Sequence, residues 1–272
     1  MKARKVIACS AVVLAILSGC GIGGTISLKN DSEVKAQLKI ASDIFEPYVY
    51  MDDNGEYTGI DVEIAKEACR RLGYEPVFST IDWSNKNSVL ESGEADCLWG
   101  CYSIAGREND YLWAGPYLYS RQVVVVRKDS GINNIADLAG KKTAVQFGSK
   151  AEGVFLNNAG ITVPYSEEVM SFPRMDQAMS AFTEGYADAA AGHEGYFLKY
   201  LGEDSYYKEL DGSILTTELG VAFSKNGNQV LADALSKVLN DMKDDGTTAR
   251  IVTEYGLDEE KYVRGGVMAD EN

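Results

Sequence analysis

One arginine in a polar turn is the residue of this chain whose type and setting best suit ligand capture. Arg107 lies in the stretch 93–121, GEADCLWGCYSIAGRENDYLWAGPYLYSR, after a short apolar strand that stops at Gly100. A guanidinium presents a planar fork of donors that matches both oxygens of a carboxylate. The pattern therefore predicts carboxylate capture by Arg107. The alternative is a surface arginine paired with Glu108 or Asp110.

Motifs for metal or nucleophilic chemistry are weak in this sequence. His193 is the single histidine, so a histidine-based metal cluster is excluded, and the zincin position after His193-Glu194 holds Phe197. Gly140 to Thr143 has the look of a phosphate loop, but Ile135 stands where its earlier glycine is required. No Ser-His-Asp arrangement stands out. We expect no cofactor, no metal and no catalysis.

The N-terminus reads as an export signal with a lipid attachment site. Lys2, Arg4 and Lys5 precede an apolar run that is too short to span a bilayer comfortably. That run ends in Leu-Ser-Gly-Cys at 17–20, which resembles the bacterial lipobox. We expect a signal peptide over 1–19, lipidation of Cys20, and a polar tether over 20–35. The protein would then be anchored on the outer face of the cytoplasmic membrane. The alternative is an ordinary signal peptide with a chance cysteine.

Composition narrows the possible partners and the redox chemistry. The 272 residues carry a formal charge of −15, and loss of the three cations in 1–19 makes it −15 − 3 = −18. Such an acidic surface argues against nucleic acid or an anionic lipid face as partner. Three thiols besides Cys20, those of Cys69, Cys97 and Cys101, allow at most one internal disulfide.

Strands alternate with helices along the whole chain. Expected strands lie at 36–42, 75–78, 97–99, 122–127, 142–146, 163–169, 187–191 and 218–224. The first expected helix has Asp61 as its N-cap and ends at Gly73. Further helices or helical turns are expected at 86–92, 135–138, 150–156, 175–184, 229–243 and 247–255. A hairpin turn is expected at 52–55. This order predicts a mostly parallel sheet covered on both faces, with ligands beyond the carboxyl ends of its strands.

From about residue 36 to 262 the chain resembles the extracellular solute-binding proteins of polar amino-acid ABC transporters. Each matching motif is short, and their order and spacing carry the resemblance. The motifs are Asp43–Phe45–Pro47–Tyr48, Gly59 to Ala65, Ser92 to Asp96, Arg107, Gly115-Pro116-Tyr117, Val124 to Ser130, Asp137 to Lys141, Gln146 to Ser149, and Asp245-Gly246-Thr247.

The resemblance implies an α/β protein with the two-lobed, type II periplasmic-binding-protein-like fold. Two mixed sheets flanked by helices would be joined by two hinge strands, and the lobes would close over a ligand. Lobe 1 would comprise 36–117 and 219–262, and lobe 2 would comprise 122–214. The hinges would lie at 118–121 and 215–218, and the tail at 263–272.

The resemblance also assigns a ligand site residue by residue. Phe45 and Trp83 match the aromatic pair that encloses the ligand, with core aromatics as the alternative. Arg107 matches the carboxylate-binding arginine. The other matching positions are backbone groups near Gly100, the hydroxyl of Ser103 or of Tyr102, Gln146, Ser149, the amides of Lys150 and Ala151, and Asp43 for the ligand side chain.

One position departs from the family pattern. The family usually places an aspartate that holds the ligand's ammonium five residues beyond the Asp of its Ala-Asp pair. Here Ala187-Asp188 leads to His193 at that position, with Glu194 next. Glu194 would take over if the strand ended one residue later, or a neutral His193 would accept the hydrogen bond and make binding pH-dependent. Otherwise Asp43 or carbonyl groups would hold the ammonium.

By resemblance, the chain is expected to be a monomeric substrate-binding lipoprotein that delivers a small amino acid to an ABC permease. The rivals are a periplasmic dehydratase of cyclohexadienyl acids on the same scaffold, and a receptor that reports to a sensor kinase. Asp43, Glu46 and Glu218 hint at a cationic or amide ligand side chain, and Trp99 hints at a small or sulfur-containing one. The sequence leaves the ligand open.

Overall fold

The computed structural model describes residues 35–157 and 163–265. The expected signal peptide, Cys20, nearly all of the tether and most of the 263–272 tail lie outside the described residues. No helix in the described part of the chain is long and apolar enough to cross a membrane.

The strands fall close to their expected positions. They are β1 (Ala36–Ser42), β2 (Tyr50–Met51), β3 (Tyr57–Thr58), β4 (Tyr74–Thr80), β5 (Cys97–Leu98), β6 (Leu112–Arg127), β7 (Lys142–Gln146), β8 (Glu168–Phe172), β9 (Ala189–His193), β10 (Tyr207–Glu209) and β11 (Leu215–Phe223).

The helices also follow the expected order. They are α1 (Ile60–Leu72), α2 (Lys86–Ser92), α3 (Lys150–Asn157), α4 (Met175–Thr183), α5 (Glu194–Phe197), α6 (Gln229–Asp244), α7 (Thr247–Glu254) and α8 (Glu259–Tyr262). Short 3₁₀ turns are η1 (Trp83–Asn85), η2 (Ile135–Leu138) and η3 (Leu198–Tyr200).

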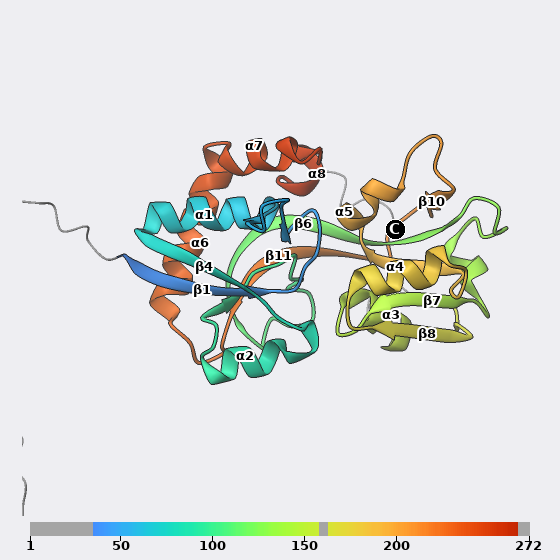
Figure 1. The fold of residues 1–272 in the computed structure, drawn as a ribbon, viewed down its shortest axis with the longest axis horizontal. Helices are drawn as coiled ribbons and strands as arrows, with labels where there is room; N and C mark the ends of the chain where they lie inside the picture. Colours follow the sequence, from blue (N-terminus) through green and yellow to red (C-terminus); the bar gives the residue numbers. More distant parts are fainter. Residues whose placement is uncertain (1–34, 158–162, 266–272) are drawn as a thin grey trace, which may run out of the picture. The chain divides into compact units, whose positions relative to one another are not determined.

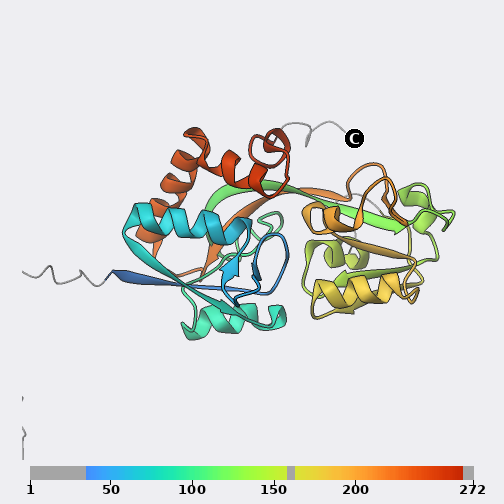
Figure 2. The same ribbon diagram turned by 45° about the horizontal axis from the view of Figure 1, so that its top comes forward.

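Two groups of parallel strands flank a central antiparallel pair. The order is β4-β1-β5-β11-β6-β9-β7-β8, with β10 pairing on β6. Pairing is parallel within β4-β1-β5 and within β9-β7-β8, and antiparallel along β11-β6. Figures 1 and 2 both show β6 and β11 as long strands that serve both groups. The two expected sheets are therefore joined through these shared strands into one ladder.

Alternation along the strands places helices on both faces of each strand group. Ala144 of β7 packs in a core with α4, and its neighbour Val145 packs in a second core with α3. Likewise Ile40 of β1 packs with α1, and Ala41 packs with α2. Successive side chains of a strand point to opposite faces, so both faces are covered.

Several expected boundaries were wrong. The strand expected at 122–127 is the second half of the 16-residue β6, because β11 pairs with it from Leu112 to Gln122. Strand β8 begins five residues later than expected, and β9 runs on to His193. β10, α5 and α8 were not expected, and none of them exceeds four residues.

The start of α1 differs from expectation in a way that matters for the site. Gly59, not Asp61, is the N-cap, and Asp61 lies buried in the first turn. Its Oδ2 accepts hydrogen bonds from the backbone N–H of Cys101 at 2.6 Å and from the hydroxyl of Tyr117 at 2.9 Å. Cys101 adopts a left-handed backbone with φ 49°. Asp61 thereby anchors the turn that follows β5.

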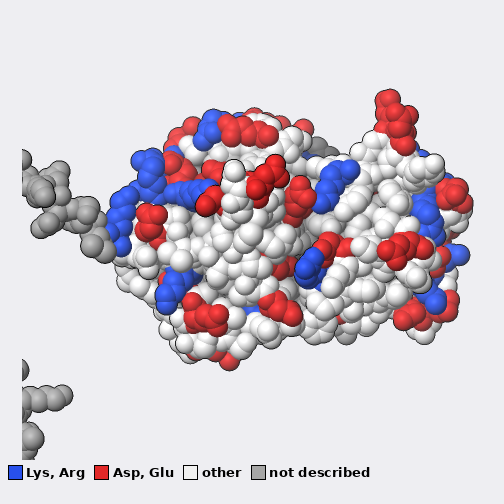
Figure 3. All heavy atoms as spheres, in the orientation of Figure 1, with Lys and Arg blue, Asp and Glu red and all other residues white. Residues whose placement is uncertain are grey.

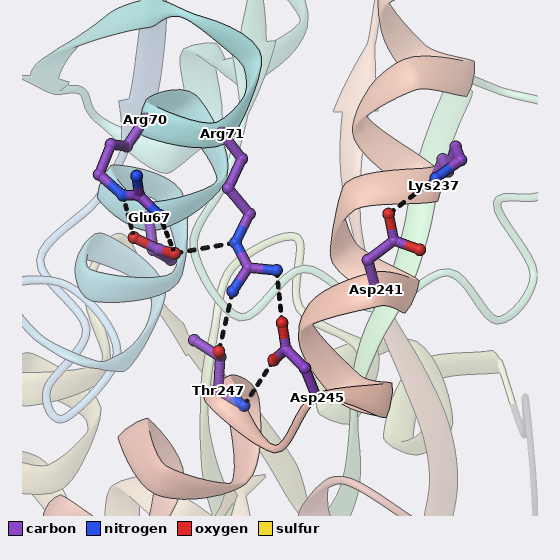
Figure 4. Close-up of polar contacts among 7 residues, drawn as sticks. All are labelled: Glu67, Arg70, Arg71, Lys237, Asp241, Asp245 and Thr247. Atoms are coloured by element: carbon purple, nitrogen blue, oxygen red, sulfur yellow. Dashed lines mark hydrogen bonds and ion pairs between the residues drawn. The ribbon is translucent and has the colours of Figure 1, made fainter.

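A salt-bridge cluster ties α1 to the junction of α6 and α7 (Figure 4). Arg71 donates to Glu67 at 2.8 Å, to Asp245 at 2.7 Å and to Thr247 Oγ1 at 2.9 Å. Asp245 in turn accepts from the backbone N–H of Thr247. Hydrogen bonds from Arg70 and Arg71 lower the pKa of Glu67 to about 2. The Asp-Gly-Thr motif at 245–247 thus forms the junction of α6 and α7 and fixes it to α1.

Charges of both signs lie on the surface (Figure 3), and the three described cysteines are unpaired. On the face drawn in Figure 3, acidic and basic side chains are interspersed. Cys69, Cys97 and Cys101 are buried free thiols. Burial raises the pKa of Cys69 to about 12, so its thiol stays protonated.

Replacing Asp61 by alanine is expected to lower the free energy of unfolding by about 1–3 kcal/mol, because the Cys101 amide and Tyr117 hydroxyl lose their acceptor. Burial raises the pKa of Asp61 to about 7. The raised pKa stabilises the fold below pH 4, and this contribution is lost as pH rises through 7. Urea unfolding should therefore show a larger loss at pH 5 than at pH 8. Asp53→Ala, at an exposed position, is the control. If Asp61→Ala lowered the free energy of unfolding no more than this control does, the role of Asp61 would be contradicted.

Candidate ligand-binding site

A small cavity of ≈ 30 Å³ lies where the two strand groups face each other. It is lined by the ligand-binding residues expected from the sequence, apart from Ala151 and Glu194. The lining residues are Asp43, Phe45, Trp83, Gly100, Cys101, Tyr102, Ser103, Arg107, Gln146, Gly148, Ser149, Lys150 and His193. The volume holds about two water molecules, so an amino acid can enter only if the two sides move apart.

The ends of four strands position these residues. Asp43 follows β1, the 100–103 turn follows β5, Gln146 ends β7, and His193 ends β9. The carboxyl ends of neighbouring parallel strands meet at one edge, as expected for a ligand site in an open α/β sheet. Gly100 is required at its position, because a Cβ there would lie 1.9 Å from the hydroxyl of Ser42.

Arg107 spans the cavity and has no acidic partner. Its Nη1 donates to the carbonyl of Ser103 at 3.2 Å, and its Nη2 donates to the carbonyl of Gly148 at 2.9 Å. The Tyr102 ring lies 4.8 Å from the guanidinium carbon. Glu108 accepts instead from the backbone N–H of Gly106. Among the described residues Arg107 has no carboxylate within 4 Å, so the surface ion-pair alternative does not hold there.

A second contact crosses the cavity. The Gln146 amide donates to Asp43 Oδ2 at 2.6 Å. Burial raises the pKa of Asp43 to about 6, although the Gln146 hydrogen bond and the Lys86 charge oppose the shift. The Gln146–Asp43 and Arg107–Gly148 bonds together hold the two sides against each other.

Phe45 and Trp83 are both buried and both line the cavity, with exposed fractions of 5% and 6%. Phe45 packs on Tyr196 at 5.0 Å between ring centroids, and Trp83 meets Tyr102 edge-on at 4.9 Å. The Tyr102 hydroxyl donates to Tyr111 at 2.9 Å. Tyr102 and Ser103 both line the cavity, and the Tyr102 hydroxyl already has a partner in Tyr111.

His193 is buried between two serine hydroxyls. Its Nδ1 lies 2.8 Å from Ser120 Oγ, and its Nε2 lies 3.4 Å from Ser103 Oγ. Burial, with a smaller effect of the Arg107 charge, lowers the pKa of His193 to about 3. The expected pH dependence of binding through this histidine therefore finds no support.

Glu194, like Ala151, is an expected site residue that does not line the cavity. It begins α5 and accepts hydrogen bonds from Arg121 at 2.7 Å, from Tyr262 at 3.2 Å and from Lys261. Burial alone would raise the pKa of Glu194, but Arg121 and Lys261 hold it below the ordinary value. Glu194 joins α5 to α8 and is not available to a ligand.

The acids that hinted at a cationic ligand also lie elsewhere, apart from Asp43. Glu46 pairs with Lys199 at 2.6 Å, and Glu218 is an exposed residue of β11. Trp99 is 1% exposed and packs on Tyr117 in the core. The hints drawn from these three residues have no support in the cavity.

Three residues at or near the cavity, Cys101, Gly148 and Lys86, were missed by the sequence reasoning. Gly148 lines it and accepts from Arg107, and Lys86 lies behind it at the start of α2. The available signal for Lys86 was its position three residues after Trp83, one turn along a helix. Within the described ranges, no group of three or more His, Cys, Asp or Glu could hold a metal ion.

Comparison with known proteins places the chain in a family. Residues 38–258 match the bacterial extracellular solute-binding proteins, family 3. The chain belongs to this family, whose members bind substrates for transport. The type II periplasmic-binding-protein-like fold inferred from the resemblance is confirmed.

The individual relatives are moderately similar. The L-cystine-binding protein TcyA of Bacillus subtilis (strain 168) is 29% identical over 258 residues, which is 90% of this chain and 93% of that one. An ancestral arginine-binding protein, solved with arginine, is 27% identical with a TM-score of 0.71, over 81% of this chain and 98% of that chain. An ancestral amino acid-binding protein, AncCDT-1, described as a precursor of cyclohexadienyl dehydratase, is 25% identical with a TM-score of 0.72, over 81% and 95%.

The single histidine offers a direct test of the site's electrostatics. We expect the ring resonances of His193 in tag-free protein to stay constant from pH 8 to pH 5 in ¹H–¹³C NMR spectra, because the imidazole stays neutral. The lowered pKa stabilises the fold above about pH 6.5, and this contribution is lost as pH falls towards 3. A ring titration centred near pH 6.5 would show that His193 is solvated.

Proposed function

We propose that this protein is the substrate-binding lipoprotein of an amino-acid ABC importer. It would bind a small amino acid in the cavity and deliver it to the permease without chemical change. The observation that carries the proposal is Arg107, a guanidinium that lines the cavity with no carboxylate partner among the described residues. Cystine- and arginine-binding relatives support the ligand class.

In this proposal Arg107 holds the ligand carboxylate, and Phe45 and Trp83 enclose the ligand body. Asp43 takes the ammonium, since Glu194 is occupied by Arg121 and Lys261 and His193 offers no charge. Gln146, Ser149, Lys150 and the turn at 100–103 complete the contacts. Contacts from both lobes to the ligand take the place of the Gln146–Asp43 and Arg107–Gly148 bonds. These contacts keep the lobes closed around the ligand.

Opening requires bending between two lobes, 36–117 with 219–262 and 122–214. The proposed hinges, 118–121 and 215–218, fall within one stretch of the β6–β11 ladder, where Tyr119 pairs with Glu218 and Arg121 pairs with Thr216. Two paired strands bend more easily than a wide sheet. The ligand then stabilises the closed state by contacts to both lobes.

A dehydratase on this scaffold is a weaker candidate. It needs a general acid in the cavity, and proton transfer requires hydrogen-bond reach of the substrate. Glu194 is tied to α8, and burial keeps His193 neutral. Asp43 is the acid that remains in the cavity. The similar protein AncCDT-1 is itself described as an ancestral amino acid-binding protein.

Arg107→Ala is expected to abolish the thermal shift given by the best amino acid of a panel of the twenty amino acids and cystine. At a ligand concentration of 100 Kd, binding stabilises the wild type by about 2.7 kcal/mol, and a hundredfold weaker site leaves about 0.4 kcal/mol. Tryptophan fluorescence of the full-length chain in detergent measures the shift. Arg107→Lys keeps the charge but loses the fork, and should be intermediate.

The exposed Arg250→Ala of α7 is the control and should behave as the wild type. A ligand shift that survives in Arg107→Ala would remove the carboxylate role. The absence of a shift with every amino acid would overturn the proposed function.

Cys20→Ser is expected to move the protein from the membrane fraction to the soluble extracytoplasmic fraction of a bacterial host, because the one thiol at the expected attachment site is lost. Cys9→Ser, inside the apolar run of the signal, is the matched control and should stay membrane-bound. Fractionation followed by immunoblotting measures the change. Equal membrane association of both variants would exclude lipidation at Cys20.

A further inference from the structure

The cavity is surrounded by more positive charge than one ligand carboxylate can balance. Besides Arg107, Lys150 lines the cavity and Lys86 lies next to it, and the proposed function gives neither lysine a charged partner. The Nζ of Lys86 lies 2.9 Å from where a Cβ on Gly148 would be. The carbonyl of Gly148 accepts the Arg107 hydrogen bond, so Lys86 and Arg107 both contact this residue.

Lys86 is 9% exposed, and one of its three donors has a partner. Its Nζ donates to the carbonyl of Trp83 at 3.3 Å and lies 5.2 Å from the Trp83 ring centroid. Asp43 and Glu152 act on its charge from a distance, but Glu152 is bonded to the backbone N–H of Gly148. Among the described residues, no carboxylate lies within 4 Å of Lys86.

Lys150 is half-buried at the start of α3, with no hydrogen bond or ion pair to its ammonium in the described part of the chain. A Cβ on Gly106 would lie 3.0 Å from its Nζ. The acids that face it at longer range are Glu108 and Asp110, and Glu108 is bonded to the Gly106 amide. Arg107 adds like charge.

Two cations, Arg107 and Lys150, and one carboxyl, that of Asp43, therefore line the cavity, and beside Gly148 lie a third cation, Lys86, and Glu152, whose carboxylate is bonded to the Gly148 amide. A zwitterion with an uncharged side chain brings one carboxylate, which pairs with Arg107. Lys86 and Lys150 would then be enclosed without a partner when the lobes close, and an enclosed unpaired charge is costly. A ligand with a second acidic group removes this cost through charge-assisted hydrogen bonds.

We propose that the ligand is an amino acid with an acidic group on its side chain, and that Lys86 and Lys150 bind that group. Arg107 holds the α-carboxylate and Asp43 holds the ammonium. This inference rests on the proposed function and narrows its ligand to one charge class. It reverses the expectation of a cationic or amide side chain.

The test compares each acid with the amide of the same shape. Isothermal titration calorimetry on the full-length chain in detergent uses L-aspartate with L-asparagine and L-glutamate with L-glutamine, and then L-arginine and L-cystine. At least one acid should bind about tenfold or more tightly than its amide, arginine and cystine. Shape is matched within each pair, so the ratio reports the second negative charge.

Lys86→Met and Lys150→Met keep the length of the side chain without the charge. Each should weaken the acid about tenfold and change the amide less than threefold, so that the acid-to-amide ratio falls. Lys66→Met, an exposed lysine of α1, is the matched control and should leave the ratio unchanged. A lysine that merely supports the loop would weaken acid and amide equally, which would overturn its proposed role. If a methionine variant fails to fold, the glutamine variant is measured in its place.

The outcomes separate the two proposals. Tighter binding of an amide, arginine or cystine by the wild type would overturn this inference and leave amino-acid binding standing. No heat and no thermal shift with any amino acid would overturn the proposed function itself.

Discussion

The antiparallel pairing of β6 with β11 is the constraint on which the rest of this protein depends. These two strands alone join the β4-β1-β5 group to the β9-β7-β8 group in the ladder of the described residues. Helices cover both faces of each parallel group. The carboxyl ends of β1, β5, β7 and β9 are therefore the parts of the two groups that face each other. The ligand cavity is the space between those ends. The position of the site is thus a consequence of topology, and its chemistry is decided by the few side chains placed there.

Those side chains form a site that is closed by its own polar groups. Asp43 and Gln146 bond to each other, and Arg107 bonds to a carbonyl of the opposite side. Both contacts use groups that would otherwise serve a ligand. Closure without ligand and closure around ligand therefore compete for the same donors, and the difference between them sets the affinity. In our proposal, the charges of Lys86 and Lys150 then select among ligands.

Much of the fold could be predicted from the sequence, because strand and helix periodicity is local. The ends of β1, β7, α2 and η2 fell where alternation, caps and turn residues placed them. Asp43 and Gln146 line the cavity because each stands at the end of a strand, and Arg107 lines it from the loop after β5. What failed depends on tertiary contact. The N-cap role of Asp61 was lost because Cys101, 40 residues away, takes its carboxylate. Glu194 follows His193 directly, but its partner Lys261 is 67 residues away in the chain. A local sequence pattern cannot predict such a pair.

The Glu194 cluster also determines how the molecule can move. On the cavity side, the halves are held by single hydrogen bonds that a ligand or water can replace. On the other side, Glu194 is held by Arg121, Lys261 and Tyr262, and Arg121 also bonds to Glu209. Parting that cluster would break several charge-assisted hydrogen bonds at once. In the proposed motion, opening is therefore easier at the cavity than at the Glu194 cluster, and α8 helps to keep the cluster side together.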